Sequence, residues 1–252
     1  MKKTREITEY IRPTAIKYAD NVSNADLLLK DNGLQVPLNC DKFATIKGKG
    51  SIILDFGKEY SGGIRIITYK ATDGQVFFTR ARVRFGESLS ECCSELGEKN
   101  SGNHHSVRDS EVGIPNLSDQ RIGSSAFRFV RIDNLENVNW SVVSVYLEYV
   151  HCDAERIGAF ECDDARVNGI YEAAVRTTFL NMQNGYIWDG AKRDRLVWSG
   201  DLNTEIITAR YVFGDVSNVP DSLDFCRECY PLPSWMNNIP AYSVWYILNL
   251  CD

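Results

Sequence analysis

Apolar and polar residues alternate with a period of two between about residues 51 and 149, a pattern typical of half-buried β-strands. It predicts strands over residues 51–56, 64–69, 77–85, 127–132 and 140–149. Gly62-Gly63 predicts a turn between the first two strands, and Asp73-Gly74 predicts a hairpin turn before the third. Short strands with no helical stretch between them favour an antiparallel β-sandwich of the jelly-roll kind.

The third strand separates its residues by chemistry. Its apolar face would carry Phe77, Thr79, Ala81, Val83 and Phe85. Its other face carries Arg80, Arg82 and Arg84, which we expect to pair with neighbouring carboxylates rather than to bind a polyanion. The polar segment 86–125, which includes His104 and His105, is predicted to form mainly connecting loops.

After Asp153 the period becomes helical. A first helix would start at Asp163 or Asp164, a second would follow Asp201, a third would lie around Leu223–Cys229, and an apolar one would cover Ala241–Leu250. The first would use Val167, Ile170, Tyr171, Ala174, Val175 and Phe179 as its apolar positions, and the second would turn Ile206, Ile207 and Tyr211 inward. We therefore predict two domains, a sandwich over 1–152 and a helical part over 153–252.

Charge and composition exclude several classes of protein. With 28 basic against 34 acidic residues the net charge is −6, which argues against a nucleic-acid-binding surface. No apolar run approaches the roughly 20 residues of a membrane-spanning helix, and no apolar segment follows the basic residues at the N-terminus as it would in a signal peptide. The eight cysteines are spread through a chain of ordinary core content, so we expect reduced thiols and a cytoplasmic location.

The densest concentration of chemistry lies at residues 188–201, which read WDGAKRDRLVWSGD. The segment contains three aspartates, three cations and two tryptophans. Carboxylates transfer protons and hold sugar hydroxyls, and an indole face suits the apolar side of a sugar ring. A charged loop whose side chains pair locally would also explain the composition. Cleavage of a glycoside needs such a set: one acid to protonate the leaving oxygen and a second carboxylate to activate water or to attack carbon.

This segment resembles the signature of the bacterial α-L-rhamnosidases of glycoside hydrolase family 78. The resemblance extends to GAFECDDARVNGIYEAAVRTTFLNMQ, which is similar to the entry into the catalytic barrel of that family. It also extends to LDFGKEYSGGIRI, VRFGES and SAFRFVRID, which are similar to the preceding β-sandwich. The implied fold is thus an antiparallel β-sandwich followed by the first helices of an α/α barrel of six helical hairpins.

The resemblance also implies roles for individual residues. Asp194 stands where the family has its general-acid Glu, one methylene longer, and Asp189, Arg193, Trp198 and Asp201 match positions that bind the sugar. The implied activity is inverting hydrolysis of terminal α-L-rhamnosides or similar deoxy-sugar glycosides, without an organic cofactor. The general base of the family is a Glu far downstream, so we expect this sequence to be an inactive fragment. The alternative is a non-catalytic carbohydrate-binding or remnant protein built on the sandwich.

One further motif is Cys226-Arg227-Glu228-Cys229. A Cys-x-x-Cys pair supplies two of the four ligands of a structural zinc site, but the sequence offers no second pair or nearby histidine to complete it. We therefore predict that the two cysteines bind no metal and that the chain has no metal site.

Overall fold

A computed structural model describes residues 3–69, 77–99, 101–103 and 106–251. By compactness the chain divides into a strand unit, residues 9–149, and a helical unit that combines residues 1–8 with 150–252. The domain assignment made from the sequence, 1–152 and 153–252, stays a prediction. Among the described residues, no helix is both long and apolar enough to cross a membrane.

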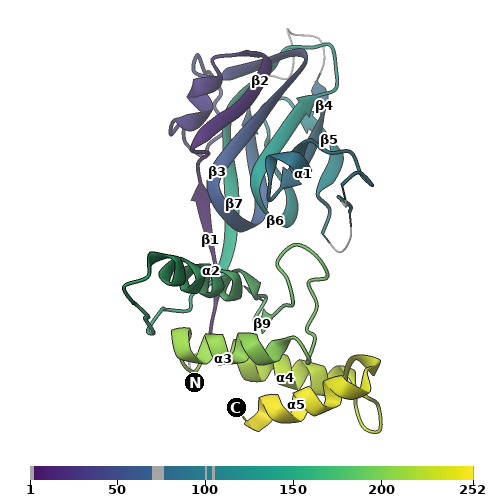
Figure 1. The fold of residues 1–252 in the computed structure, drawn as a ribbon. Helices are drawn as coiled ribbons and strands as arrows, with labels where there is room; N and C mark the ends of the chain where they lie inside the picture. Colours follow the sequence, from purple (N-terminus) through teal and green to yellow (C-terminus); the bar gives the residue numbers. More distant parts are fainter. Residues whose placement is uncertain (1–2, 70–76, 100, 104–105, 252) are drawn as a thin grey trace. The chain divides into compact units, whose positions relative to one another are not determined.

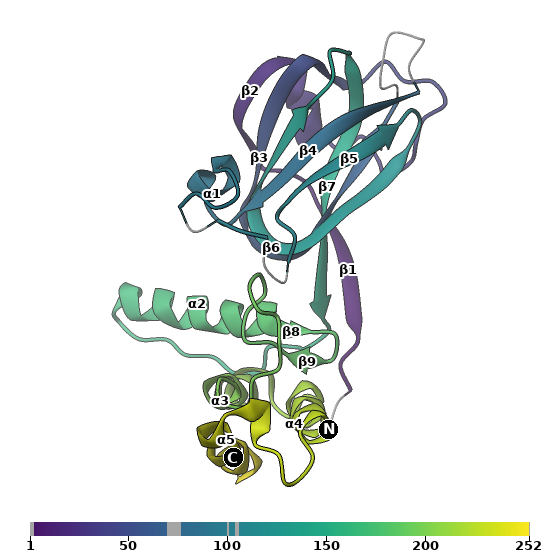
Figure 2. The ribbon, with the colours of Figure 1, turned by 90° about the vertical axis from the view of Figure 1, so that its right-hand side faces the viewer.

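The strand unit is built on one strongly curled sheet (Figures 1 and 2). The strands run in the order β1-β7-β3-β6-β4-β5, and β2 pairs with β3 beside this path. Their bounds are β1 Glu6–Ile11, β2 Ala15–Ser23, β3 Ala44–Thr68, β4 Phe78–Gly86, β5 Asp109–Pro115, β6 Asp119–Asn134 and β7 Trp140–Cys152. A short 3-10 helix, η1 (Ala25–Leu29), follows β2.

Strands β3 and β6 are long because each belongs to both layers of the sandwich. The first half of β3 pairs with β2 and with the end of β6, and its second half pairs with the start of β6. Strand β7 pairs with the first residues of β3, 44–46, and with its second half. The register of β3 on β6 shifts between Asp55 and Tyr60, where the strand passes from one layer to the other. An irregularity at this point lets one strand bend around a core.

The turn predicted at Gly62-Gly63 is wrong, because β3 runs through both residues without reversing. A Cβ atom at Gly62 would collide with the carbonyl oxygen of Glu148 on β7, and one at Gly63 would collide with backbone atoms of Gly123 on β6. The two glycines therefore allow neighbouring strands to approach closely, which a sequence pattern does not distinguish from a turn.

The core of the strand unit lies between these layers. Phe127 on β6 is fully buried, and its ring contacts Phe56 on β3 edge-on and Phe85 on β4, with ring centroids 6.0 and 4.4 Å apart. The predicted apolar face of β4 is confirmed for its residues 79, 81, 83 and 85, all buried. Phe77, which precedes the strand, is 83% exposed, so that part of the prediction is wrong.

The prediction that 86–125 consists mainly of loops is also wrong in part. The segment contains a short helix, α1 (Leu89–Cys93), the whole of β5 and the start of β6. Strand β5 escapes the pattern because it lies at the end of the sheet order and buries few of its residues, so it has little alternation. The predicted hairpin turn at Asp73-Gly74 and the pair His104 and His105 lie outside the described residues.

The arginine stripe on β4 pairs with carboxylates, as expected. Arg82 forms ion pairs with Glu95 and Asp109, and Arg84, although only 3% exposed, bonds to Glu95 and Asp133. Burying a guanidinium without such partners would be strongly unfavourable. These arginines therefore form ion pairs within the strand unit.

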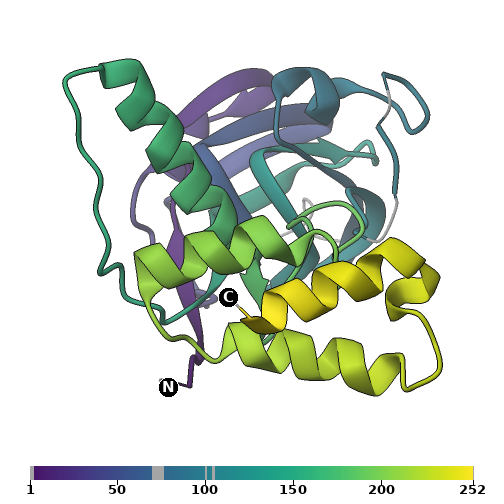
Figure 3. The same cartoon turned by 60° about the horizontal axis from the view of Figure 1, so that its bottom comes forward.

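The helical unit contains α2 (Ala165–Asn181), α3 (Leu202–Phe213), α4 (Asn218–Cys229) and α5 (Pro240–Cys251). A two-stranded ribbon, β8 (Met182–Gln183) with β9 (Tyr186–Ile187), follows α2, and a short 3-10 turn, η2 (Met236–Asn238), precedes α5. Helix α3 contacts both α2 and α5 (Figure 3). All four predicted helices are confirmed, and Asp164 is the N-cap of the first, accepting a hydrogen bond from the backbone N–H of Arg166.

The first residues of the chain belong to this unit through hydrogen bonds. The Thr4 hydroxyl donates to Asn218 Oδ1 at 2.6 Å, and the Arg5 backbone N–H donates to Asp153 Oδ1 at 2.7 Å. These contacts join chain segments more than 140 positions apart, so no local sequence pattern could predict them.

The predicted inward faces of the helices are correct only in part. Helix α3 buries Leu202, Ile206, Ala209, Val212 and Phe213. Ile207 and Tyr211 lie beside this stripe and are 38% and 80% exposed, so their predicted inward position is wrong. On α2, Val167 and Ile170 are also exposed. The period predicts a helix, but neighbouring helices decide which of its apolar residues they cover.

Replacing Phe127 by Ala tests the core of the strand unit. Because the ring is fully buried between two other aromatic rings, the substitution should lower the free energy of opening of the β6 amides by about 3–5 kcal/mol. Native-state hydrogen exchange measures this quantity. Phe78→Ala, which removes a ring that is 52% exposed, is the matched control and should change it by less than about 1 kcal/mol. Equal effects would contradict the assignment of the core.

Candidate functional site

The signature segment forms the connection between the β8–β9 ribbon and α3. It begins at Trp188, whose backbone N–H donates to the carbonyl of Asn181 at the end of α2. It ends at Asp201, the residue immediately before α3. Both ends of the connection are therefore fixed to helices of the same unit.

Asp189 closes the connection into a loop. Its backbone N–H donates to the carbonyl of Leu196, and its side-chain Oδ1 accepts the backbone N–H of Leu196, both at 2.9 Å. Burial, followed by the negative charges of Asp194 and Asp201, raises the pKa of the Asp189 carboxyl. Asp189 is thus both the latch of the loop and a carboxylate partly removed from water.

Asp194 lies at the tip of this loop. Asp194 and Arg195 both have left-handed backbone conformations, with φ of 59° and 57°, and the Arg195 N–H donates to the carbonyl of Arg193. A left-handed conformation is unfavourable for side chains other than glycine, and its presence here orients a functional candidate. The Asp194 side chain is 35% exposed and therefore open to solvent.

Two arginines flank the tip and serve different purposes. Arg193, with a side chain 69% exposed, lies 3.4 Å from Asp194 Oδ2, a long and solvated ion pair that contributes little stability. The guanidinium of Arg195 instead lies 4.7 Å from the ring centroid of Trp188, which is buried. This cation–π contact ties the tip to the start of the loop.

The second half of the connection is held by polar contacts to η2 and α5. Ser199 donates from both its N–H and its hydroxyl to Asn237 Oδ1 at 3.0 Å, and Asn249 Nδ2 donates to the Ser199 carbonyl at 2.8 Å. Ser199 and Asn249 are buried, so these bonds also satisfy groups that water cannot reach. The last helix of the chain thereby helps to place the signature segment.

Trp198 and Asp201 meet at Tyr242. The Tyr242 hydroxyl donates to Asp201 Oδ2 at 3.2 Å, and its ring lies edge-on to Trp198 with centroids 6.0 Å apart. Burial and the charge of Asp201 raise the pKa of Tyr242 above its ordinary value, so the hydroxyl stays protonated and able to donate into the alkaline range. A Cβ atom at Gly200 would collide with the Tyr242 ring, so the glycine of this signature is required for that approach.

Glu205 is a further carboxylate of the site that the motif does not contain. It lies on α3 one turn after Asp201, and Asn181 Nδ2 donates to its Oε1 at 2.6 Å. Burial, with the charges of Asp189 and Asp201 as smaller causes, raises its pKa to about 7. The spacing of four between Asp201 and Glu205 places both on one helix face and is the sequence signal that could have identified it.

The structure thus brings Asp189, Trp198 and Asp201 to one loop–helix junction, with Asp194 and Arg193 at the more exposed tip. Burial, fixed orientation and like charges are the features expected of a site that binds hydroxyl groups and transfers protons. No three His, Cys, Asp or Glu side chains in the described part of the chain are arranged to hold a metal ion. Cys226 is buried while Cys229 is exposed, and the expectation that they bind no zinc stays a prediction.

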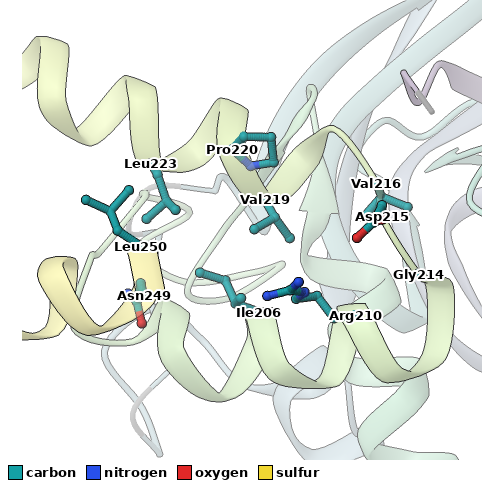
Figure 4. A pocket seen from close by; sticks show the side chains of 10 residues that line it. All are labelled: Ile206, Arg210, Gly214, Asp215, Val216, Val219, Pro220, Leu223, Asn249 and Leu250. Atoms are coloured by element: carbon teal, nitrogen blue, oxygen red, sulfur yellow. The ribbon is translucent and has the colours of Figure 1, made fainter. Parts of the chain in front are cut away.

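A pocket of about 290 Å³ lies elsewhere in the helical unit (Figure 4). Side chains from α3, α4 and α5 line it, among them Ile206, Val219 and Leu223. None of the predicted site residues lines this pocket. The candidate site is therefore defined by its chemistry and not by the depth of a cavity.

Comparison with known proteins agrees with the resemblance noted in the sequence. Residues 155–248 match the family model of the bacterial alpha-L-rhamnosidase 6 hairpin glycosidase domain. No curated protein matches the sequence. The resemblance to bacterial α-L-rhamnosidases is confirmed by this match, which contains the whole signature segment.

Solved structures show the same fold. A rhamnosidase from Klebsiella oxytoca with rhamnose bound aligns with 98% of this chain at a TM-score of 0.75 and 18% identity. A family 78 rhamnosidase of Bacillus sp. GL1 aligns with 89% at 0.66 and 19% identity. The α-L-rhamnosidase of Dictyoglomus thermophilum aligns with 97% at 0.59 and 18% identity. The fold is therefore a β-sandwich followed by helices of the six-hairpin barrel.

The chain spans only part of these relatives. It covers 52% of the Klebsiella oxytoca protein, 23% of the Bacillus protein and 25% of the Dictyoglomus protein.

Replacing Asp189 tests the latch of the loop. Asp189→Ala removes the acceptor for the Leu196 N–H, so trypsin should cleave at Lys192, Arg193 or Arg195 about tenfold faster or more. Asp189→Asn keeps an acceptor oxygen in the same place, so its cleavage rate should stay within about threefold of the wild-type rate. Mass spectrometry of timed digests gives the rates, with Asp224→Ala on α4 as the control. Equal cleavage of all four proteins would show that Asp189 does not close the loop.

Proposed function

We propose that this chain carries the sugar-binding and general-acid side of an inverting glycosidase site that acts on terminal α-L-rhamnosides or similar deoxy-sugar glycosides. The observation that carries the proposal is the convergence of Asp189, Trp198 and Asp201 at one junction. This junction lies within the segment that matches the α-L-rhamnosidase domain. The bound rhamnose named for the Klebsiella oxytoca relative supports the same class of sugar.

The sugar would be held by complementary surfaces. Asp201, oriented by the Tyr242 hydroxyl, and Asp189, oriented by the Leu196 N–H, offer carboxylate oxygens that accept hydrogen bonds from sugar hydroxyls. Trp198, which is only partly buried, offers an aromatic face to the apolar side of the ring. Rhamnose has a methyl group in place of a hydroxymethyl group, so an apolar surface suits it.

Asp194 would act as the general acid. It occupies the tip of the loop, where its carboxyl can reach a leaving oxygen, and Arg193 beside it would orient the carboxyl or a sugar hydroxyl. Its side chain is one methylene shorter than the Glu of the family. The loop must therefore bring the carboxyl closer to the glycosidic oxygen, and the left-handed backbone at Asp194 and Arg195 is the local feature that sets its direction.

An inverting enzyme also needs a general base roughly 6.5–9.5 Å from the acid, on the other side of the sugar. The resemblance assigns that role to a Glu downstream of this sequence. We propose that the 252-residue chain binds the sugar without hydrolysing its glycosides, and that it needs no organic cofactor. All eight cysteines lie in the described part of the chain and none forms a disulfide, which supports a cytoplasmic location.

Calorimetry with L-rhamnose tests the binding. The chain should bind L-rhamnose in preference to D-glucose, and Asp201→Ala should weaken binding about tenfold or more, because a charged hydrogen-bond acceptor is lost. Asp224→Ala is the matched surface control. The chain should leave 4-nitrophenyl α-L-rhamnoside intact. Unchanged affinity in Asp201→Ala would mean that the sugar binds elsewhere, as in a carbohydrate-binding protein built on the sandwich. Hydrolysis of 4-nitrophenyl α-L-rhamnoside would show that the chain contains its own general base.

Replacing the acid tests the catalytic role in a chain completed by the barrel helices that the resemblance places after it. Asp194→Asn should lower kcat/KM about 100- to 10,000-fold for aryl rhamnosides with poor leaving groups. For very acidic leaving groups the loss should be much smaller, because such groups depart without protonation. Steady-state kinetics on both substrate types gives the comparison. Equal losses would mean that Asp194 only binds the sugar.

A further inference from the structure

Glu205 has one bonded and one unbonded carboxylate oxygen. Its Oε1 accepts the hydrogen bond from Asn181, which is itself only 5% exposed. Its Oε2 is buried and has no hydrogen-bond partner among the described residues. A buried oxygen of an ionised carboxylate without a donor is strongly unfavourable, whereas the same oxygen carrying a proton is neutral.

The position of Glu205 connects it to the candidate site from two sides. Along α3 it lies one turn after Asp201, on the same face of the helix. Across the unit it is bonded to Asn181, whose carbonyl accepts the N–H of Trp188, the first residue of the signature loop. Glu205 is therefore linked to both ends of the signature loop, through Asn181 at Trp188 and through α3 at Asp201, although it is not part of the loop.

Like charges favour the neutral form of this residue. Asp189 and Asp201 are negatively charged groups near enough to raise its pKa, in addition to the larger effect of burial. With a pKa of about 7, Glu205 is protonated in mildly acidic solution and ionised in mildly alkaline solution. While Glu205 holds its proton, it adds no negative charge beside Asp189 and Asp201.

We propose that Glu205 is a positioning residue of the sugar site, held as the neutral acid close to Asp189 and Asp201 so that no further negative charge disturbs the orientation of these two carboxylates. The proposal rests on the function proposed above for the same site. Ionisation of Glu205 would place a further negative charge beside Asp189 and Asp201, and repulsion between these carboxylates would push the loop away from α3. A displaced Asp189 no longer presents its oxygens to the sugar together with Asp201, so sugar affinity falls when Glu205 ionises.

The decisive measurement is a carbon-13 NMR titration of the carboxyl groups in the intact chain between pH 4 and 9. The Glu205 signal should titrate near pH 7 and not near its ordinary value of about 4.3. The Asp189 carboxyl signal should shift a second time at the pH where Glu205 ionises, and this second shift should be absent in Glu205→Gln, because the amide cannot acquire a charge. Glu228→Gln, which changes an exposed carboxylate on α4, should leave the Asp189 titration unchanged.

Calorimetry with L-rhamnose at pH 5.5 and pH 8.5 provides the functional readout. The affinity of the wild type and of Glu228→Gln should fall about three- to tenfold at the higher pH. A sugar that prefers protein with protonated Glu205 raises the Glu205 pKa on binding, and a tenfold preference corresponds to a rise of about one pKa unit. Glu205→Gln should keep its low-pH affinity at both values. Glu205→Asp, which retains the charge on a shorter stem, should not reproduce the flat profile.

Stability supplies a readout that does not depend on the sugar. The unfolded chain releases the Glu205 proton near its ordinary pKa of about 4.3, while the folded chain retains it to about pH 7. The folded state thus binds more protons in this window, and its stability falls as pH rises through it. Urea unfolding should show this fall in the wild type and a smaller one in Glu205→Gln.

The outcomes separate this proposal from the proposed function. If L-rhamnose binds at no pH, the proposed function fails, while the titrations of Glu205 and Asp189 still decide the role of Glu205. If Glu205 titrates near its ordinary value, or if Glu205→Gln leaves the Asp189 titration and the pH profile unchanged, this proposal is overturned. Should Glu205→Gln fail to fold, the wild-type titration alone decides the protonation state on which the proposal depends.

Discussion

The constraint on which the candidate site depends is electrostatic. Asp189, Asp201 and Glu205 are gathered at one loop–helix junction from which water is partly excluded, and burial together with like charges raises the pKa of Asp189 and of Glu205. The structure offsets this with the donors Leu196 N–H, Asn181 and the Tyr242 hydroxyl, each aimed at one carboxylate. While Glu205 is neutral, the junction carries one negative charge fewer. Such an arrangement is unfavourable for folding and favourable for binding hydroxyls, which is typical of a functional site.

The helical unit holds this junction by contacts that converge from distant segments. Asn181 at the end of α2, Asn237 in η2 and Asn249 in α5 all donate to or accept from the connection between β9 and α3. Residues of the last helix are thus part of the support of the site, although they supply none of the candidate chemistry. The same helix exposes several large apolar side chains, namely Val244, Trp245, Ile247, Leu248 and Leu250.

The strand unit uses a different principle. Its longest strand, β3, serves both layers of the sandwich, so its bend must be fixed. Asp55, at the end of the first half, is nearly inaccessible and accepts hydrogen bonds from Arg128, Lys17 and the backbone N–H of Gly57. The bond from Arg128 is the largest cause that lowers the Asp55 pKa to about 2. A charged, fully bonded carboxylate at the bend therefore helps to define where the strand changes layer.

The sequence by itself determined what depends on local periodicity and on a motif with fixed spacing. Alternation predicted strand residues in β3, β4, β6 and β7 but not β1, β2 or β5; a helical period predicted all four α-helices of the helical unit, and the signature identified a fold that the structural comparisons bear out. Only the tertiary structure decided that Gly62 allows strand contact instead of a turn, that β5 is a strand, and that Tyr211 faces outward. It also revealed Glu205, because a raised pKa arises from burial and neighbouring charges that are set by packing. Period is a property of a segment, whereas burial, register and charge environment are properties of the segments that pack against it.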